Sequence, residues 1–155
     1  MVVYEIVPHV GVGAVNLGMS RADARAVMPE LRPLLLFDGS VPDGDYRDLA
    51  HDNAFQVTYD SPDGKIEFIE LGQTAAMGVT FAGQLILSLD ADEALGILTA
   101  QASYDETDPE LGHSYIFPAL ELSVWRPSVP KDDGDLDGRH FATIGIGVAG
   151  YWSAA

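Results

Sequence analysis

The sequence contains no cysteine in its 155 residues, so disulfide bonds, thiolate nucleophiles and thiolate metal ligands are excluded. Basic residues are also scarce. Eight lysines and arginines stand against 24 acidic residues, which gives a net charge of −16 at pH 7. Because such a chain repels polyanions, we expect neither nucleic acid nor an anionic membrane surface as its partner.

Long apolar runs are missing as well. No stretch approaches the ~20 consecutive apolar residues that a membrane-spanning helix needs. The first residues, Met1 to Glu5, have neither the basic region nor the apolar core of a signal peptide, so we expect a cytoplasmic protein. The hydrophobic fraction of 47% argues against disorder and predicts a single compact domain over residues 1–155.

The start of a first helix is well marked. Ser20 can accept a hydrogen bond from the backbone N–H of Asp23, and the Asp23 carboxylate can reach back to Ser20. Pro29 ends the pattern, because the residue before a proline avoids the helical conformation. The sequence therefore predicts a helix from Arg21 to Met28.

A second helix, over about Ala91 to Gln101, begins in the same way, with Asp90 as its cap and Glu93 three residues later. Each helix is followed by an acidic loop and by strands. This repeated order predicts an α+β fold with antiparallel sheets and two short helices. It is also consistent with internal duplication of a helix-then-strands unit, in halves of about residues 1–80 and 81–155.

The clearest hairpin has its turn at Ser61–Gly64, between two runs of alternating apolar residues. On the return strand Ile66 and Phe68 share a face, and Ile69 changes it, which predicts a bulge near Phe68 and Ile69. Further extended segments are expected over residues 2–7, 12–17, 31–37, 79–87, 114–117, 120–125 and 141–148.

The glycine run from Gly145 to Gly150 has the letters of a dinucleotide-binding motif. That chemistry needs a helix directly after the glycines, so that phosphate meets the helix N-terminus, and only five residues follow. We therefore expect no nucleotide cofactor. The glycines instead predict a strand that bends or lies under bulky neighbours such as Trp125 and Trp152.

The run Asp133, Asp135 and Asp137 matches the opening of a calcium-binding loop. Its twelfth position, which should be a bidentate glutamate, is Ile144, and the flanking segments are strand-like. We expect a solvated hairpin loop and no metal site. The four histidines show no pair at metal-ligand spacing, and no catalytic set stands out.

The helix opening Gly18-Met19-Ser20-Arg21 resembles the G-M-[ST]-x-x-x-V opening of the SmpA/OmlA-type outer-membrane lipoproteins, with Ala24 in the place of the valine. The order of elements resembles that of the β-lactamase inhibitor protein family, which is built from two helix-plus-antiparallel-sheet repeats. The resemblance implies a protein-binding role and not an activity. It assigns no functional residue.

These features favour a non-enzymatic acidic module that binds another, basic protein, such as an immunity or inhibitor protein that neutralises a toxin or enzyme. The predicted interface is the acidic loop from Asp38 to Asp52, where Asp43, Asp45 and Asp48 would supply steering and rim contacts. Because we take these aspartates to be solvated, neutralising them should hardly change stability.

The alternative function is a small-ligand-binding protein or a hydrolase. Its pocket would be lined by Trp125, Tyr151 or Trp152 and would contain a loop carboxylate. The sequence predicts no cofactor for either function, and it does not indicate an oligomeric state.

Overall fold

The computed structural model describes residues 1–44 and 46–153. They form an α+β fold, as predicted, with two short helices and two β-sheets. The strands are β1 (Val2–Val7), β2 (Gly11–Val12), β3 (Val15–Asn16), β4 (Arg32–Pro33), β5 (Arg47–Ala50), β6 (Phe55–Tyr59), β7 (Ile66–Gly72), β8 (Met77–Phe81), β9 (Gln84–Leu85), β10 (Ser114–Phe117), β11 (Leu122–Trp125) and β12 (Thr143–Gly147). The helices are α1 (Arg21–Val27) and α2 (Ala91–Thr99), with a 3-10 turn, η1 (Pro118–Leu120).

The larger sheet is antiparallel and has the order β10-β11-β12-β7-β6-β5-β4. The smaller sheet has the order β3-β2-β1-β8-β9, and it is mixed because β1 and β8 run parallel. Strands from both predicted halves enter both sheets, and the internal duplication stays a prediction. Among the described residues, neither helix is long and apolar enough to cross a membrane.

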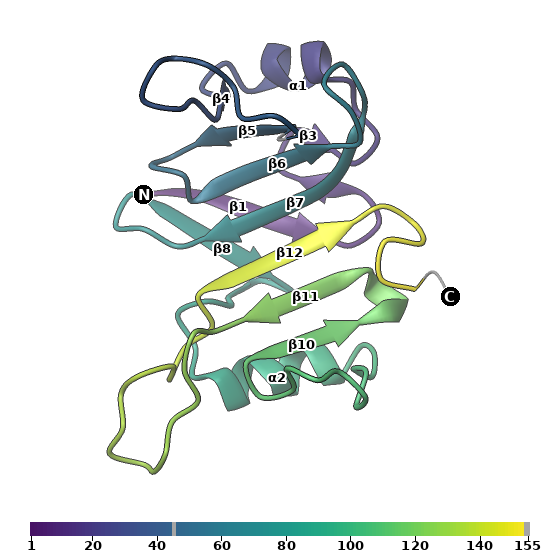
Figure 1. The fold of residues 1–155 in the computed structure, drawn as a ribbon. Coiled ribbons are helices and arrows are strands. Elements are labelled where there is room, and N and C mark those ends of the chain that lie inside the picture. Colours follow the sequence, from purple (N-terminus) through teal and green to yellow (C-terminus); the bar gives the residue numbers. More distant parts are fainter. Residues whose placement is uncertain (45, 154–155) are drawn as a thin grey trace.

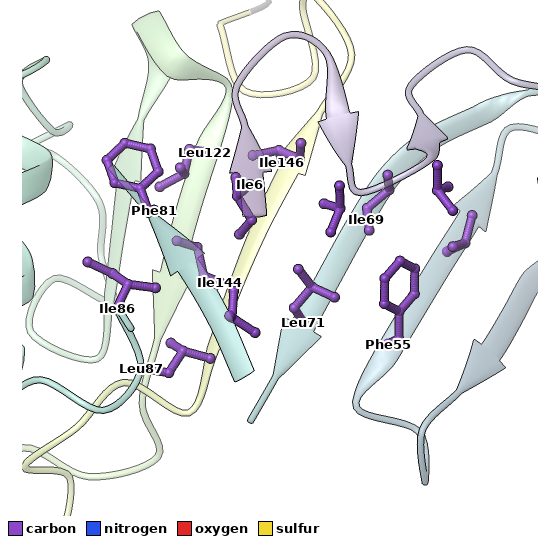
Figure 2. Close-up of a cluster of buried hydrophobic side chains, with 14 of the residues drawn as sticks. Ile6, Phe55, Ile69, Leu71, Phe81, Ile86, Leu87, Leu122, Ile144 and Ile146 are labelled. Carbon is purple, nitrogen blue, oxygen red and sulfur yellow. The ribbon is translucent and has the colours of Figure 1, made fainter. Parts of the chain in front are cut away.

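The core lies between the two sheets. Figure 1 shows the seven-stranded sheet with β1 and β8 behind it and with α2 behind β10. In Figure 2 the side chain of Ile6, from the smaller sheet, lies next to that of Ile146 on the larger one, and Phe81 lies next to Leu122. All of these side chains are buried, so the two sheets and the helices share one apolar interior.

The first helix begins as predicted. The Ser20 hydroxyl accepts a hydrogen bond from the Asp23 N–H at 3.1 Å, and α1 runs from Arg21 to Val27. The second helix also begins after Asp90, as predicted, but the Asp90 side chain makes no cap hydrogen bond. The two helix starts therefore differ in how much their cap residues contribute.

Replacing Ser20 by alanine should lower the free energy of unfolding by about 1 kcal/mol, because one N–H of the first turn loses its partner. Ser20→Gly should cost less. Asp90→Ala is the matched control and should cost less than Ser20→Ala, since no cap bond is lost there. Urea melts of the three variants test this, and equal losses at the two helix starts would contradict it.

The bulge in the main hairpin lies close to its predicted place but has a different effect. Thr58 pairs with Phe68 and Tyr59 pairs with Ile66, which leaves Glu67 as the extra residue. The prediction that Ile66 and Phe68 share a face was therefore wrong. Phe68 faces away from the core, yet it is only 9% exposed, because the Tyr151 ring stacks on it at a centroid distance of 4.6 Å.

The glycines of β12 lie under bulky side chains, as predicted, but the side chains that cover them are not the expected Trp125 and Trp152. A Cβ atom on Gly145 would lie 2.4 Å from the Phe68 ring, and one on Gly147 would lie 2.5 Å from Tyr151. The covering residues are thus Phe68 and Tyr151, with Trp152 packed edge-on against both rings. The glycine run therefore serves packing of the C-terminal segment on the sheet.

Candidate functional site

The structure separates the three aspartates of the predicted interface. Asp43 is exposed in the loop between β4 and β5. Asp45 lies outside the described residues. Asp48 belongs to β5, and its side chain is fully buried, so the expectation that it is solvated was wrong. A buried carboxylate cannot supply rim contacts to a partner.

Asp48 is the centre of an ion cluster that joins α1 to the sheet. Its Oδ1 accepts hydrogen bonds from Arg21 Nη2 at 2.8 Å and from Arg25 Nη2 at 2.9 Å. Its Oδ2 accepts from Arg25 Nε at 3.0 Å and from the Tyr59 hydroxyl at 2.9 Å. The Arg21 guanidinium also lies over the Tyr59 ring, 4.8 Å from its centroid.

The electrostatics of this cluster favour a charged aspartate. Burial alone would raise the pKa of Asp48, but the hydrogen bonds from Arg25, Arg21 and Tyr59 lower it below its ordinary value. Burial, followed by the Asp48 charge, raises the pKa of the Tyr59 hydroxyl. Because the carboxylate oxygens are occupied by their partners, the cluster holds α1 against β5 and does not present a free carboxylate.

Between β4 and β5 the chain forms a tight turn over residues 36–40. The Gly39 N–H donates to the Leu36 carbonyl at 2.9 Å, and the Leu36 N–H donates to the Ser40 carbonyl at 2.7 Å. Gly39 has a φ of 83°, and Asp38 accepts from both the N–H and the hydroxyl of Ser40. This pattern fits a three-residue hairpin loop closed by a glycine bulge.

This turn displays apolar side chains in water. Phe37, within the turn, is fully exposed, and Leu35, Leu36 and Val41 are each about half exposed. Soluble proteins seldom leave such side chains together on the surface without an interaction partner. We call residues 34–44 the Phe37 loop; they belong to the dark blue loop that projects at the upper left of Figure 1.

A groove of about 450 Å³ adjoins the Phe37 loop. Leu34 and Leu35 line it together with residues from β4, β5 and the turn after β5. Its complete lining is Glu30, Arg32, Pro33, Leu34, Leu35, Leu49, Ala50, His51, Asp52 and Asn53. The groove and the exposed loop thus form one continuous surface with both apolar and charged groups.

A second cavity, of about 490 Å³, lies between the start of α2 and the loop that contains the calcium-like run. There the Asp135 carboxylate accepts hydrogen bonds from the backbone N–H groups of Lys131 and Asp137. Among the described residues, no group of three or more acidic or histidine side chains could hold a metal ion. Two aspartates of this loop, Asp132 and Asp135, thus accept hydrogen bonds from its own backbone.

The aromatic residues of the alternative function line neither cavity. Trp125 is 42% exposed on β11, while Tyr151 and Trp152 pack on Phe68. Tyr151 and Trp152 therefore pack the C-terminal segment against the sheet.

No family model, curated protein or solved structure matches this chain. The candidate site therefore stands on its own geometry. Of the predicted interface, Asp43 remains on the surface, and Asp38, from the same predicted loop, is exposed as well. Phe37 was missed, because the apolar run before it was read as a strand. The Asp38-Gly39 pair, a common turn signal, marks the hairpin that displays it.

Proposed function

We propose that this protein binds another protein through the Phe37 loop, and that the partner offers an apolar pocket within a basic surface. The observation that carries the proposal is the full exposure of Phe37 on a turn closed by backbone hydrogen bonds. Aromatic side chains are enriched at protein interfaces, and burying one stabilises a complex by about 1.5–3 kcal/mol.

The closed turn supports this role by limiting the entropy lost on binding. The two backbone hydrogen bonds that Leu36 makes with Gly39 and Ser40, and the bonds from Ser40 to Asp38, close the turn over residues 36–40. A loop that is already ordered loses less freedom when it docks. Phe37 is therefore presented in a form suited to an anchor residue.

The charge of the chain indicates a basic partner. Asp38 and Asp43 stand in the same loop as Phe37, and the whole chain carries a net charge of −16. An apolar centre with a charged rim is the usual arrangement of a specific interface. Within this proposal, the module has no enzymatic role, resides in the cytoplasm, and acts as an immunity or inhibitor protein for a basic toxin or enzyme.

Capture from an extract of the source cells tests the proposal, with three immobilised proteins compared. The parent chain and Leu136→Ser should retain the same basic protein, and Phe37→Ser should not. Leu136 is the matched control because it is an exposed apolar residue, 69% exposed, in another acidic loop. Equal retention of that protein by Phe37→Ser would contradict a role for the Phe37 loop.

Neutralising the acidic rim should slow association with the captured partner. We expect Asp38→Asn/Asp43→Asn to reduce the association rate roughly 3- to 10-fold at low salt and to flatten its salt dependence, while dissociation changes less. Asparagine at position 38 keeps an oxygen that can accept the Ser40 hydrogen bonds. The rates are measured by surface plasmon resonance at two salt concentrations.

The control for this prediction is Glu106→Gln/Glu110→Gln, which changes the net charge equally at two exposed residues outside the Phe37 loop. It should slow association much less than the loop variant. If both double variants slow association equally, the slower association is caused by the change in total charge, and Asp38 and Asp43 are not contact residues of the interface.

A further inference from the structure

Five aspartates of this chain are each followed directly by a glycine, and they are Asp38, Asp43, Asp63, Asp133 and Asp137. Such a pair can rearrange without an enzyme, because glycine has no Cβ atom to shield its backbone nitrogen from the aspartate carboxyl group. All five aspartates are exposed. Exposure of the carboxyl group therefore does not distinguish the pairs, and the difference between them lies in what holds each glycine.

In three of the pairs the glycine N–H already donates a hydrogen bond. The Gly39 N–H donates to the Leu36 carbonyl at 2.9 Å, and the Gly64 N–H donates to the Ser61 carbonyl at 3.0 Å. The Gly134 N–H donates to the Asp132 carboxylate at 3.0 Å. Each of these nitrogens must lose its hydrogen bond before it can attack the preceding side chain, so the fold protects these three pairs.

The pair Asp137-Gly138 is held by packing. A Cβ atom on Gly138 would overlap the carbonyl group of Ser128, so the two backbone segments touch. The Gly138 carbonyl also accepts a hydrogen bond at 2.9 Å from Nη1 of Arg126, a side chain that is only 6% exposed. The Gly138 nitrogen cannot turn toward Asp137 without disturbing both contacts.

The pair Asp43-Gly44, in the Phe37 loop, has none of these restraints. Neither residue forms a hydrogen bond or an ion pair with any described residue. Both residues are exposed, and a Cβ atom on Gly44 would meet no other atom within 4 Å. Nothing in the described part of the chain therefore keeps the Gly44 nitrogen away from the Asp43 carboxyl group.

We propose that Asp43-Gly44 is a site of spontaneous isomerisation, at which aspartate becomes isoaspartate. The Gly44 nitrogen attacks Cγ of Asp43 and loses its proton, while one carboxyl oxygen leaves as water and a succinimide ring closes. Water then adds to the ring. Opening of the bond between the nitrogen and Cγ restores aspartate, and opening of the bond between the nitrogen and the α-carbonyl carbon gives isoaspartate.

The water lost in the first step is regained in the second, so the rearrangement needs no other reactant. Its product lengthens the backbone of the Phe37 loop by one atom and places the free carboxylate on the α-carbon. The proposal goes beyond the proposed function and depends neither on a partner nor on Phe37.

The test is to incubate the folded chain in mildly acidic buffer, well below its melting temperature, and to follow isoaspartate with time. Mass spectrometry of the digested protein with electron-transfer fragmentation distinguishes isoaspartate from aspartate at each pair. We expect isoaspartate to accumulate at Asp43 at least about 5-fold faster than at any other pair, since the others must first break a contact. Equal rates at all five pairs, or a faster reaction at another pair, would overturn the proposal.

The same incubation in concentrated urea tests whether the fold is the cause. All five pairs have the same two residues, so we expect them to react at similar rates in the unfolded chain. If Asp43 led by the same margin in urea, the neighbours in the sequence would be the cause, and the structural argument would be overturned.

Variants confirm the position. Asp43→Glu keeps the charge but would have to close a six-membered ring, which forms far more slowly, and it should lose the product in the Phe37 loop. Asp137→Glu is the matched control and should isomerise at Asp43 like the parent. A thermal melt checks that both variants are folded. Persistence of the isomerised loop peptide in Asp43→Glu would overturn the assignment to this pair.

Discussion

Asp48→Ala should lower the free energy of unfolding by about 2–4 kcal/mol. The change removes the carboxylate at the centre of the ion cluster. Arg21, with 16% of its side chain exposed, keeps its bonds to the Pro62 and Arg47 carbonyls but loses its charged partner, and the buried Tyr59 hydroxyl loses its acceptor. Breaking a buried ion pair from one side costs about 3–5 kcal/mol. We expect a loss that can be smaller than this range, because the Arg25 side chain is 42% exposed and water can hydrate its guanidinium once Asp48 is removed.

Urea unfolding of the variant measures this loss, and Asp43→Ala is its control. Asp43 lies on the surface, so its removal should change stability by no more than about 0.5 kcal/mol. This reverses the expectation from the sequence that Asp48 could be neutralised without cost. Equal stabilities of the two variants would mean that the cluster does not hold α1 in solution.

The same cluster makes stability depend on pH in a predictable direction. Hydrogen bonds from the arginines and Tyr59 outweigh burial and lower the pKa of Asp48 in the folded state, below the value of about 3.9 for an unfolded chain. Its contribution is therefore complete above that value and is lost as the pH falls through the folded-state pKa. Asp48→Asn should lose less stability than the parent over this acid range.

Local signals predicted the local structure well. Ser20 as a cap, the Ser61–Gly64 turn and the alternation along β6 each depend on residues close in sequence, and each element is present. The parallel pairing of β1 with β8 was not predicted. The residues of β1 and β8 do not indicate which strand each one pairs with, because that pairing depends on how the two sheets pack.

Asp48 shows why the interface was only partly predicted. Its neighbours Gly44, Asp45 and Asp52 are typical of a loop, and the strand between them is only four residues long. The useful signal lay elsewhere. Arg21 and Arg25, two of only eight basic residues, are four positions apart on one face of a helix, a spacing that lets both reach the same carboxylate.

The acidity of the loops also has a structural component that composition did not reveal. Aspartates bond the backbone N–H two residues further on, as is usual in turns. Among the described residues five such bonds occur, from the N–H groups of Ser40, Thr107, Glu110, Gly134 and Asp137 to the carboxylates of Asp38, Asp105, Asp108, Asp132 and Asp135. Charge runs in this chain thus stabilise turns as well as surround the protein with negative potential.

The second large effect is expected at Phe37. Phe37→Ala should weaken binding of the captured partner by about 2–4 kcal/mol, or roughly 30- to 1,000-fold, because an anchor residue contributes most of its energy at the centre of an interface. Its own stability should change by no more than about 0.5 kcal/mol, since the side chain is fully exposed and supports nothing in the free protein.

Titration calorimetry of the partner with the parent, Phe37→Ala and Leu136→Ala, combined with urea melts of the same samples, tests the central claim most directly. We predict that Phe37→Ala loses at least about 30-fold in affinity while its unfolding midpoint matches the parent, and that Leu136→Ala matches the parent in both. An affinity of Phe37→Ala within about twofold of the parent would show that the protein does not bind its partner through the Phe37 loop.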